Sequence, residues 1–464
     1  MSSQVRLRLL PRSSCLFDEP VRLKVSGLRS RQLVALTARS TDQKGVEFSS
    51  RASYRADGSG EVHLDRDPSL GGSYAGVEPM GLLWSMRPDS SHRKLVIRNS
   101  LHPHVVKFSV HEQDGDGRLL AEAANERLLI GDGVVRRPVR GEHFQGVLFT
   151  PPGPGPFPAV LDLYVLGGGL SERRASLLAT RGFVVLSLVV FGYEDLPKVI
   201  TEVHLDYYQE AMQFLQKQDK VSLCLCGQLS FVCLCCWSPR PGEQSIKVFQ
   251  SLVDFSVSPP PQVGSKGVGV LSLSKTGDVA LSMASYLPGV EAVVSINGCC
   301  SNTNLPLYYK KKQILPPLMV DFSKMILTES GAYMPKNALH NPLAEENEAC
   351  LIPIERAKAH FLFVAAEDDL NWDSKAYMEE MVRRMKSHRR TNFESVLYPR
   401  AGHFLEPPYE PHCPSSFHPL VGKPVVWGGE PSCHAAAEVH LWKKIQEFFR
   451  AHLSCDAAPT KALL

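Results

Sequence analysis

The sequence contains no run of 18 or more apolar residues, so it predicts no transmembrane helix. The nearest candidate, residues 223–237, is too short and is interrupted by glycine and polar residues. No signal-peptide core is present, and the final Ala-Leu-Leu differs from a peroxisomal Ser-Lys-Leu address. Arg6, Arg8 and Arg12 precede the first acid, Asp18, as they could in a mitochondrial transit peptide. We expect a cytoplasmic protein, with mitochondrial and peroxisomal locations as alternatives.

An excess of charge of one sign is also missing. The chain has 51 Lys and Arg against 48 Asp and Glu, which gives a formal net charge of +3. This near balance gives no reason to expect a nucleic-acid partner. With 44% apolar and 21% charged residues, the 464-residue chain has the composition of a soluble globular protein. Such a chain can bury a large core without disulfides or metals.

Common zinc-site spacings of cysteine are absent as well. Five of the 12 Cys cluster together: Cys224, Cys226, Cys233, Cys235 and Cys236. Their pattern, Cys-x-Cys followed later by Cys-x-Cys-Cys, is not a usual zinc spacing, and no His lies nearby. The other seven are scattered, as expected for reduced thiols. We therefore expect no metal site.

Two sequence patterns indicate two domains. Residues 1–140 contain short β-rich segments separated by turns and show no helical period, which favours a β-sandwich. Residues 141–455 alternate between strands and helices, which is typical of an α/β domain with a parallel sheet. Residues 456–464 are expected to be a disordered tail. The expected strands are 143–150, 159–166, 183–191, 268–273, 290–296, 361–366 and 395–398, and the expected helices 172–181, 202–217, 277–287, 375–386 and 435–452.

One segment, about 222–260, does not fit this alternation. Connections between a helix and the next strand usually take about 2–6 residues, and this one is several times longer. It is rich in Cys at its start and ends in three prolines. We interpret it as an atypical insertion that the fold tolerates poorly or leaves disordered, or that derives from translated non-coding sequence.

The strongest chemical signal is Ser274. An apolar strand runs directly into this serine and a helix follows at once, which is the pattern of a nucleophile elbow. The usual Gly-x-Ser-x-Gly is replaced here, since Ser272 and Thr276 flank the nucleophile. Thr276, being β-branched, is expected to crowd the turn. Residues 269–276 also resemble a phosphate-binding P-loop. In a P-loop, however, the strand precedes the first glycine, whereas here the apolar strand lies between Gly269 and Lys275, so we reject that interpretation.

Two further residues complete a candidate triad in the order acid, then His. Asp369 follows the strand 361–366, and His403 lies in a loop after the strand 395–398. Functional groups of open α/β sheets gather at the carboxyl ends of the strands. Taken singly, a helix N-cap, a turn carboxylate and a solvated histidine are the alternative interpretations. Together their order and placement predict a Ser274–His403–Asp369 triad on an α/β-hydrolase fold.

An oxyanion hole needs two backbone N–H donors. One is expected at Lys275, directly after the nucleophile. The other is expected at Gly168, within the Gly167-Gly-Gly169 loop that follows the strand 159–166. A simple tight turn is the alternative interpretation of these glycines.

Several longer motifs resemble the family of type I acyl-CoA thioesterases and bile acid-CoA:amino acid N-acyltransferases. They include Gly71-Gly-Ser-Tyr-Ala-Gly-Val-Glu-Pro-Met-Gly-Leu-Leu-Trp84, Tyr193-Glu-Asp-Leu-Pro197, Ser295-Ile-Asn-Gly298, Gly402-His403 with Glu406-Pro-Pro-Tyr409, and Trp427-Gly-Gly-Glu-Pro431. The resemblance covers nearly the whole chain except about 222–260. It implies an N-terminal β-sandwich, a C-terminal α/β-hydrolase domain, and a nucleophile, acid and base at Ser274, Asp369 and His403.

The resemblance also implies a reaction. The thioesterase branch hydrolyses acyl-CoA to a fatty acid and CoA without a cofactor. We expect this chain to bind medium- to long-chain acyl-CoA as its substrate. We expect it to be a monomer or a small homo-oligomer. The acyltransferase branch passes the acyl group to glycine or taurine but uses Cys as nucleophile, so Ser274 favours hydrolysis. The chain departs from the family's glycines at Ser272, Thr276 and Val165. Thr276 and the insertion at about 222–260 leave a catalytically weak acyl-CoA-binding homologue as a third alternative.

Overall fold

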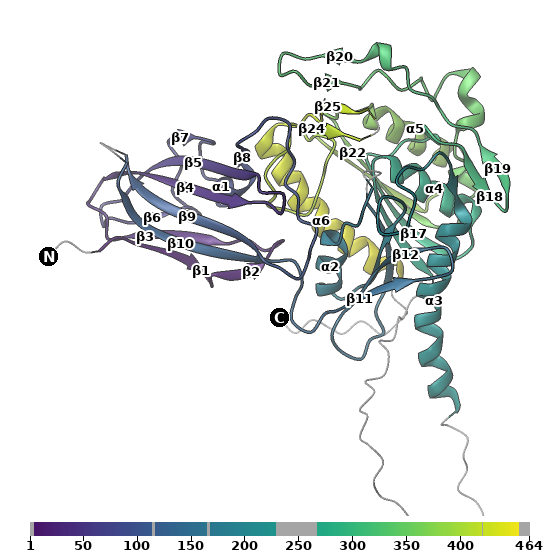
Figure 1. Cartoon of the computed structure of the whole chain (residues 1–464), viewed down its shortest axis with the longest axis horizontal. Coiled ribbons are helices and arrows are strands. Elements are labelled where there is room, and N and C mark those ends of the chain that lie inside the picture. Colours follow the sequence, from purple (N-terminus) through teal and green to yellow (C-terminus); the bar gives the residue numbers. More distant parts are fainter. Residues whose placement is uncertain (1–3, 114–116, 165–167, 229–266, 420, 454–464) are drawn as a thin grey trace, which may run out of the picture.

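The N-terminal part of the computed structural model is a β-sandwich, as predicted (Figure 1). The structure describes residues 4–113, 117–164, 168–228, 267–419 and 421–453. One sheet has the order β1-β3-β6: β1 (Arg6–Leu10), β3 (Arg22–Ser26) and β6 (Val62–His63). The other has the order β2-β10-β9-β4-β5-β7, with β8 also paired to β5: β2 (Ser14–Leu16), β10 (Leu119–Leu128), β9 (His104–Glu112), β4 (Leu33–Thr41), β5 (Glu47–Arg55), β7 (Gly71–Gly72) and β8 (Arg87–Pro88).

The sandwich forms because its strands alternate between apolar and polar residues. In β5, Phe48, Ala52 and Tyr54 are buried while their neighbours in the chain are more exposed. These side chains share one core with Leu23 and Val25 of the facing sheet. A period of two puts every second residue on the core side of a strand. The short helix α1 (Gly81–Trp84) is buried beside this core.

The second domain is built on an eight-stranded, mostly parallel sheet of order β11-β12-β14-β13-β16-β17-β22-β23. Only the pairs β11–β12 and β12–β14 are antiparallel. The strands are β11 (Val135–Arg140), β12 (Gln145–Thr150), β13 (Ala159–Leu163), β14 (Val184–Val189), β16 (Val268–Leu273), β17 (Val290–Ile296), β22 (His360–Ala366) and β23 (Phe393–Tyr398). Because β11 belongs to this sheet, the second domain begins before the expected boundary at residue 140.

Helices cover both faces of the sheet. The helices are α2 (Arg173–Thr180), α3 (Leu205–Gln228), α4 (Lys275–Tyr286), α5 (Ser374–Ser387) and α6 (Pro431–Leu453). Val160 of β13 packs in the core that contains α2 and α6, and its neighbour Leu161 packs in the core that contains α3, α4 and α5. Such a parallel sheet between two helical layers, with both faces buried, is the predicted α/β-hydrolase architecture.

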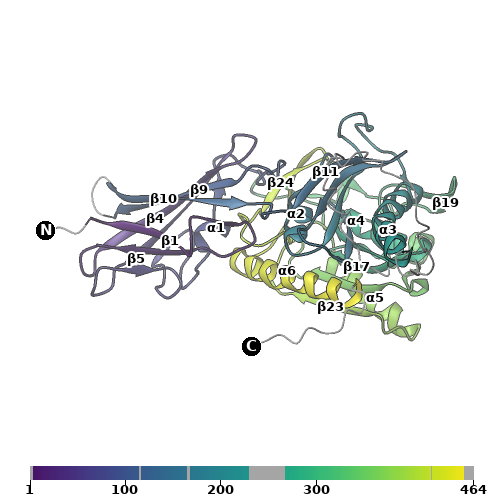
Figure 2. The ribbon, with the colours of Figure 1, turned by 90° about the horizontal axis from the view of Figure 1, so that it is seen from below.

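The two domains share an extensive interface (Figures 1 and 2). Helix α6 lies at their junction in both views. Trp442 of this helix donates a hydrogen bond to Asp18 of the sandwich at 2.8 Å, and Arg181, which follows α2, pairs with the same carboxylate at 2.8 Å. The apolar core of the sandwich is continuous with the core under α2 and α6. The sandwich is therefore held firmly against the hydrolase domain.

Short elements complete the fold, and the sequence did not predict them. One small sheet contains β15 (Val203–His204), β18 (Leu307–Tyr309) and β19 (Lys312–Leu315). A second small sheet contains β20 (Ile326–Leu327), β21 (Tyr333–Met334), β24 (Ser415–His418) and β25 (Lys423–Val426). Three 3₁₀ turns span Phe322–Lys324, Glu345–Cys350 and Ile354–Arg356. Strands of two to four residues are too short to show a period in the sequence.

The first residues of the expected insertion at 222–260 are helical, which the sequence did not predict. Helix α3 does not end near residue 217 but continues to Gln228, so residues 222–228 are helical. The rest of the insertion and the tail at 456–464 lie outside the described residues. No described helix is both long and apolar enough to span a membrane. Within the described ranges no group of His, Cys, Asp and Glu is arranged to hold a metal ion; Cys233, Cys235 and Cys236 lie outside them.

Candidate active site

Ser274 lies at the turn from β16 into α4, at the carboxyl end of a central strand. Its φ of 61° and ψ of −132° are values that residues other than glycine rarely adopt. The Ser274 N–H donates to the carbonyl of Ile296 at 2.9 Å, which ties the turn to the neighbouring strand β17. A strained serine between a strand and a helix is the geometry expected of a nucleophile elbow.

Ser272 and Thr276, which replace the usual glycines around the nucleophile, both form hydrogen bonds in the turn. The Ser272 hydroxyl donates to the carbonyl of Val294 at 2.8 Å. The Thr276 hydroxyl oxygen lies 2.8 Å from the carbonyl oxygen of Leu163 and 2.9 Å from that of Leu273. The close approach falls instead at Gly277, where a Cβ would lie 2.7 Å from the Cα of Gly298. The expected crowding at Thr276 was therefore wrong, because its side chain lies in a polar niche.

We predict that Thr276→Val destabilises the protein by about 1–3 kcal/mol, because it leaves buried backbone groups of the elbow without their hydroxyl partner. Urea unfolding would measure the change. Thr276→Ser keeps the hydroxyl and serves as the matched control. Equal stability of the valine and serine variants would show that the hydroxyl contributes nothing to holding the elbow.

The three predicted triad residues lie in one hydrogen-bonded chain. The His403 Nε2 is 2.8 Å from the Ser274 Oγ, and the His403 Nδ1 is 2.7 Å from the Asp369 Oδ2. Asp369 is buried and also accepts from the Ser374 hydroxyl and from the N–H of Asn371 at 2.8 Å. A carboxylate can only accept, so it selects the His403 tautomer with the proton on Nδ1. The Nε2 is then free to take the serine proton.

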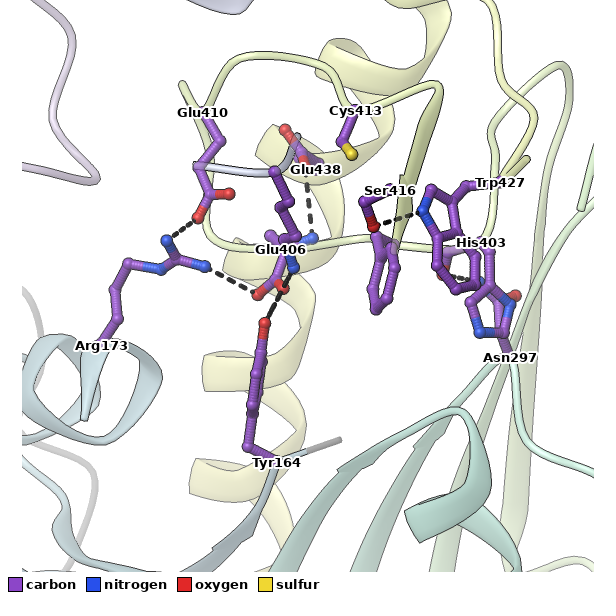
Figure 3. A network of polar contacts seen from close by, with 12 residues as sticks. Tyr164, Arg173, Asn297, His403, Glu406, Glu410, Cys413, Ser416, Trp427 and Glu438 are labelled. Atoms are coloured by element: carbon purple, nitrogen blue, oxygen red, sulfur yellow. Dashed lines mark hydrogen bonds and ion pairs between the residues drawn. The ribbon is translucent and has the colours of Figure 1, made fainter. Parts of the chain in front are cut away.

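Neighbouring groups hold the catalytic histidine in place. The Asn297 side chain donates to the His403 carbonyl at 2.6 Å and accepts from Ala366 N at 2.7 Å. Trp427 stacks on the imidazole with ring centroids 5.5 Å apart, and its carbonyl accepts from the His403 N–H at 2.8 Å. Figure 3 shows Trp427 and Asn297 on either side of His403. The ring is thus fixed both along the backbone and across its face.

Ser274 opens into a cavity of about 500 Å³ between the two domains. Lys275 and Gly168, the expected oxyanion donors, line the same cavity. The N–H of Lys275 begins α4 and so has no intrahelical acceptor, while its ammonium group is bound to Asp278 at 2.8 Å. Gly168 has a φ of +73°, and a Cβ there would lie 2.9 Å from the Phe191 ring. Val165 and Gly167 lie outside the described residues.

A buried charged network forms one wall of this cavity (Figure 3). Glu406 contacts Lys94 from the sandwich, Tyr164 from the loop after β13, and Arg173 from α2 at 3.2 Å. Burial alone would raise the pKa of Glu406, but the charges of Lys94, Arg173 and Arg174 hold it well below its usual range. Arg173 also pairs with Glu410, whose pKa burial raises to about 8. The network joins the sandwich to the loop that carries His403.

Buried neutral histidines make folding sensitive to acid. Burial lowers the pKa of four of them: His104 to about 4, His412 to about 3, His418 to about 4 and His434 to about 4. The unfolded chain, where the histidine pKa is about 6.5, takes up these protons first, so stability falls as the pH drops below 6.5. The raised pKa values of five acids, Glu78, Asp162, Asp278, Glu410 and Glu438, act in the opposite direction, so the effect of a histidine is best tested by itself.

We therefore predict that His104→Gln flattens the fall of the unfolding free energy with decreasing pH by about 1 kcal/mol per pH unit between pH 6 and 5, because the variant lacks one group that takes up a proton on unfolding. Urea unfolding at pH 7, 6 and 5 measures it. The range from pH 6 to 5 lies above the usual carboxyl pKa values, so exposed acids contribute little to the change in stability there. An equal pH dependence of the unfolding free energy in the variant and in wild type would show that His104 is not held neutral by burial.

Some residues of the site carried no role in the sequence interpretation. Asn297 and Trp427 stood within recognisable motifs, but nothing in the sequence said that they contact His403. Ser374 follows Asp369 by five residues, and only the turn into α5 shows that its hydroxyl meets the acid. The contact between Lys94 and Glu406 was not expected either, because the two residues are 312 positions apart in the sequence.

The parallel sheet, the elbow and the hydrogen-bonded Ser–His–Asp chain place the protein among the α/β hydrolases. Two family profiles match: the "Acyl-CoA thioester hydrolase/BAAT N-terminal region" over residues 18–141 and the "BAAT / Acyl-CoA thioester hydrolase C terminal" over 245–455. The chain belongs to this acyl-CoA thioester hydrolase/BAAT family, as the resemblance of its motifs implied.

Characterised relatives match over nearly the whole chain. Human "Acyl-coenzyme A thioesterase 2, mitochondrial" is 42% identical, covering 96% of this chain and 84% of the relative. Human "Acyl-coenzyme A thioesterase 1" is 41% identical over 96% of both chains. Mouse "Acyl-coenzyme A thioesterase 5" is 40% identical over 98% of this chain and 99% of the relative.

Proposed function

We propose that this protein hydrolyses medium- to long-chain acyl-CoA to a fatty acid and CoA through an acyl-serine intermediate on Ser274. The observation that carries the proposal is the hydrogen-bonded chain Ser274–His403–Asp369, which opens into a cavity large enough for part of a substrate. The family and the thioesterase names of its relatives support the choice of a thioester as substrate.

In the first half-reaction the Ser274 oxygen attacks the thioester carbonyl while its proton passes to the His403 Nε2. The carbonyl oxygen becomes an oxyanion that the N–H groups of Lys275 and Gly168 stabilise. The C–S bond then breaks and CoA leaves as the thiol, with the proton returned from His403. The acyl group remains as an ester of Ser274. Asp369 stays ionised throughout and stabilises the transient imidazolium.

In the second half-reaction His403 takes a proton from water, and the resulting hydroxide attacks the acyl-serine carbonyl. The same two N–H groups stabilise the second oxyanion. The C–O bond to Ser274 breaks, the serine oxygen recovers its proton from His403, and the fatty acid leaves. No group beyond the side chains and backbone of this chain is needed for either half-reaction.

The identity of the nucleophile favours water over an amine as the acyl acceptor. An acyl-serine is an oxygen ester, which reacts less readily with amines relative to water than an acyl-cysteine does. The family includes N-acyltransferases, so the two reactions must be separated by analysis of products.

The test is CoA release from a long-chain acyl-CoA, with and without glycine or taurine, followed by mass spectrometry of the acyl product. We expect free fatty acid as the product and a rate that does not depend on the amine. Formation of an N-acyl amino acid would instead assign the protein to amide synthesis. No release from any acyl-CoA by folded protein would leave an acyl-CoA-binding homologue.

We further propose a cytoplasmic location, which is supported by the scattered cysteines that suggest reduced thiols. Immunoblotting of fractionated cells tests it. Recovery of the protein mainly in mitochondria or peroxisomes would contradict the proposal.

A further inference from the structure

The wall of the cavity opposite the hydrolase domain comes from the β-sandwich. Residues 92–98, between β8 and β9, and the residues Asp42, Lys44 and Val46 line the same cavity as Ser274. The active site is therefore shared between the two domains, although every residue of the triad comes from one of them.

This wall is a rigid platform made of two tied segments. The buried Asp42 carboxylate accepts from the N–H groups of Lys44 at 2.8 Å, Val46 at 3.0 Å and Val96 at 3.1 Å. The Gln43 side chain accepts from the Arg98 N–H at 2.7 Å. With its carboxylate used by three backbone donors and buried, Asp42 presents little negative charge to the cavity.

Half of the Lys and Arg residues that line the cavity are already paired. Lys94 and Arg173 are bound to Glu406, and Lys275 is bound to Asp278. The remaining three, Lys44, Arg93 and Arg98, are exposed, and their side chains have no hydrogen-bond or ion-pair partner among the described residues. Of the described residues that line the cavity, Asp42 is the one acid. The platform thus presents three unneutralised positive charges at the mouth of the site.

We propose that Lys44, Arg93 and Arg98 bind the phosphate groups of the CoA nucleotide while the thioester lies at Ser274. This inference rests on the proposed function. A 3′-phosphorylated adenosine diphosphate carries several negative charges, and guanidinium and ammonium groups are the side chains that bind phosphate most strongly. The sandwich therefore supplies recognition of the CoA portion, and the hydrolase domain supplies the chemistry.

The first test is calorimetric titration of CoA into the full-length protein. The variant Lys44→Ala/Arg93→Ala/Arg98→Ala is compared with wild type and with Arg22→Ala/Arg29→Ala/Arg55→Ala. These control arginines are exposed on the same domain but do not line the cavity. We expect CoA binding to weaken by about tenfold or more in the first variant alone. Unchanged binding in that variant would overturn the proposal.

Adenosine 3′,5′-bisphosphate and dephospho-CoA identify the part of the nucleotide that is bound. The bisphosphate should bind wild type and lose affinity in the cavity variant. If inorganic phosphate bound as tightly as CoA, the platform would be a general anion site and the proposal would fail.

Kinetics separates this inference from the proposed function. Each protein is assayed with an acyl-CoA and with the matching acyl-N-acetylcysteamine, a thioester that lacks the nucleotide. We expect the ratio of kcat/KM for acyl-CoA to that for the short thioester to fall about tenfold or more in the cavity variant. The KM for acyl-CoA of wild type should rise with salt, and that of the variant should rise less.

An equal loss on both thioesters would mean that the cations act on folding or chemistry, and would overturn the proposal. If wild type cleaves neither thioester, the proposed hydrolysis fails, while the CoA titration still decides whether the platform binds the nucleotide.

Discussion

Replacement of Ser274 by alanine is expected to lower kcat for acyl-CoA hydrolysis by roughly 10⁴- to 10⁶-fold. The reason is that no other described hydroxyl lies within hydrogen-bonding distance of the His403 Nε2. Without this oxygen the acyl group cannot be transferred to the protein, and only direct attack by water remains. CoA thiol release, followed continuously with a thiol reagent, measures the loss.

Ser272→Ala is the matched control for this variant. Ser272 lies two residues before the nucleophile and is fully buried, and its hydroxyl donates to Val294 rather than to His403. We expect the control to retain activity within about threefold while losing about 1 kcal/mol of stability. A Ser274→Ala variant that releases CoA at a tenth of the wild-type rate or faster would show that another group is the nucleophile.

Replacement of Asp369 by asparagine is expected to reduce kcat by about 10³- to 10⁴-fold without loss of the fold. An amide can donate its N–H₂ to the His403 Nδ1, and the ring proton then moves to Nε2. In that tautomer the Nε2 cannot accept the proton of Ser274. The same assay, repeated at several pH values, measures the effect.

The neighbouring carboxylate supplies the control. Asp368 accepts from the Gly429 N–H at 2.8 Å and has no contact with His403, so Asp368→Asn is expected to keep most of the activity. If the two asparagine variants were equally impaired, the geometry of His403 would depend on the whole turn rather than on the Asp369 carboxylate.

The nucleophile and its partners could be predicted because their signals are local. Ser274 is marked by an apolar strand that runs directly into a helix, and both elements form as expected at β16 and α4. Asp369 and His403 each follow a recognisable strand, β22 and β23, and neighbouring parallel strands end at the same edge of a sheet. Because β22 and β23 are parallel neighbours, Asp369 and His403, which follow them, lie close together.

The side chains around the triad could not be predicted because their contacts join distant segments. Lys94 reaches Glu406 from the other domain, and Asn297 reaches the backbone of His403 across 106 residues. The expected crowding at Thr276 failed for a related reason: a threonine fits when carbonyls on two strands lie within reach of its hydroxyl. A local motif does not contain that information.

The most direct test of the central claim is active-site labelling with a fluorophosphonate, which phosphonylates an activated serine as fluoride leaves and His403 takes the proton. Intact-mass analysis and peptide mapping locate the adduct. We predict one adduct, on Ser274, that forms more slowly in the Asp369→Asn variant, is prevented by excess acyl-CoA and abolishes CoA release. An adduct on another residue, or labelled Ser274 with full release of CoA, would contradict the account.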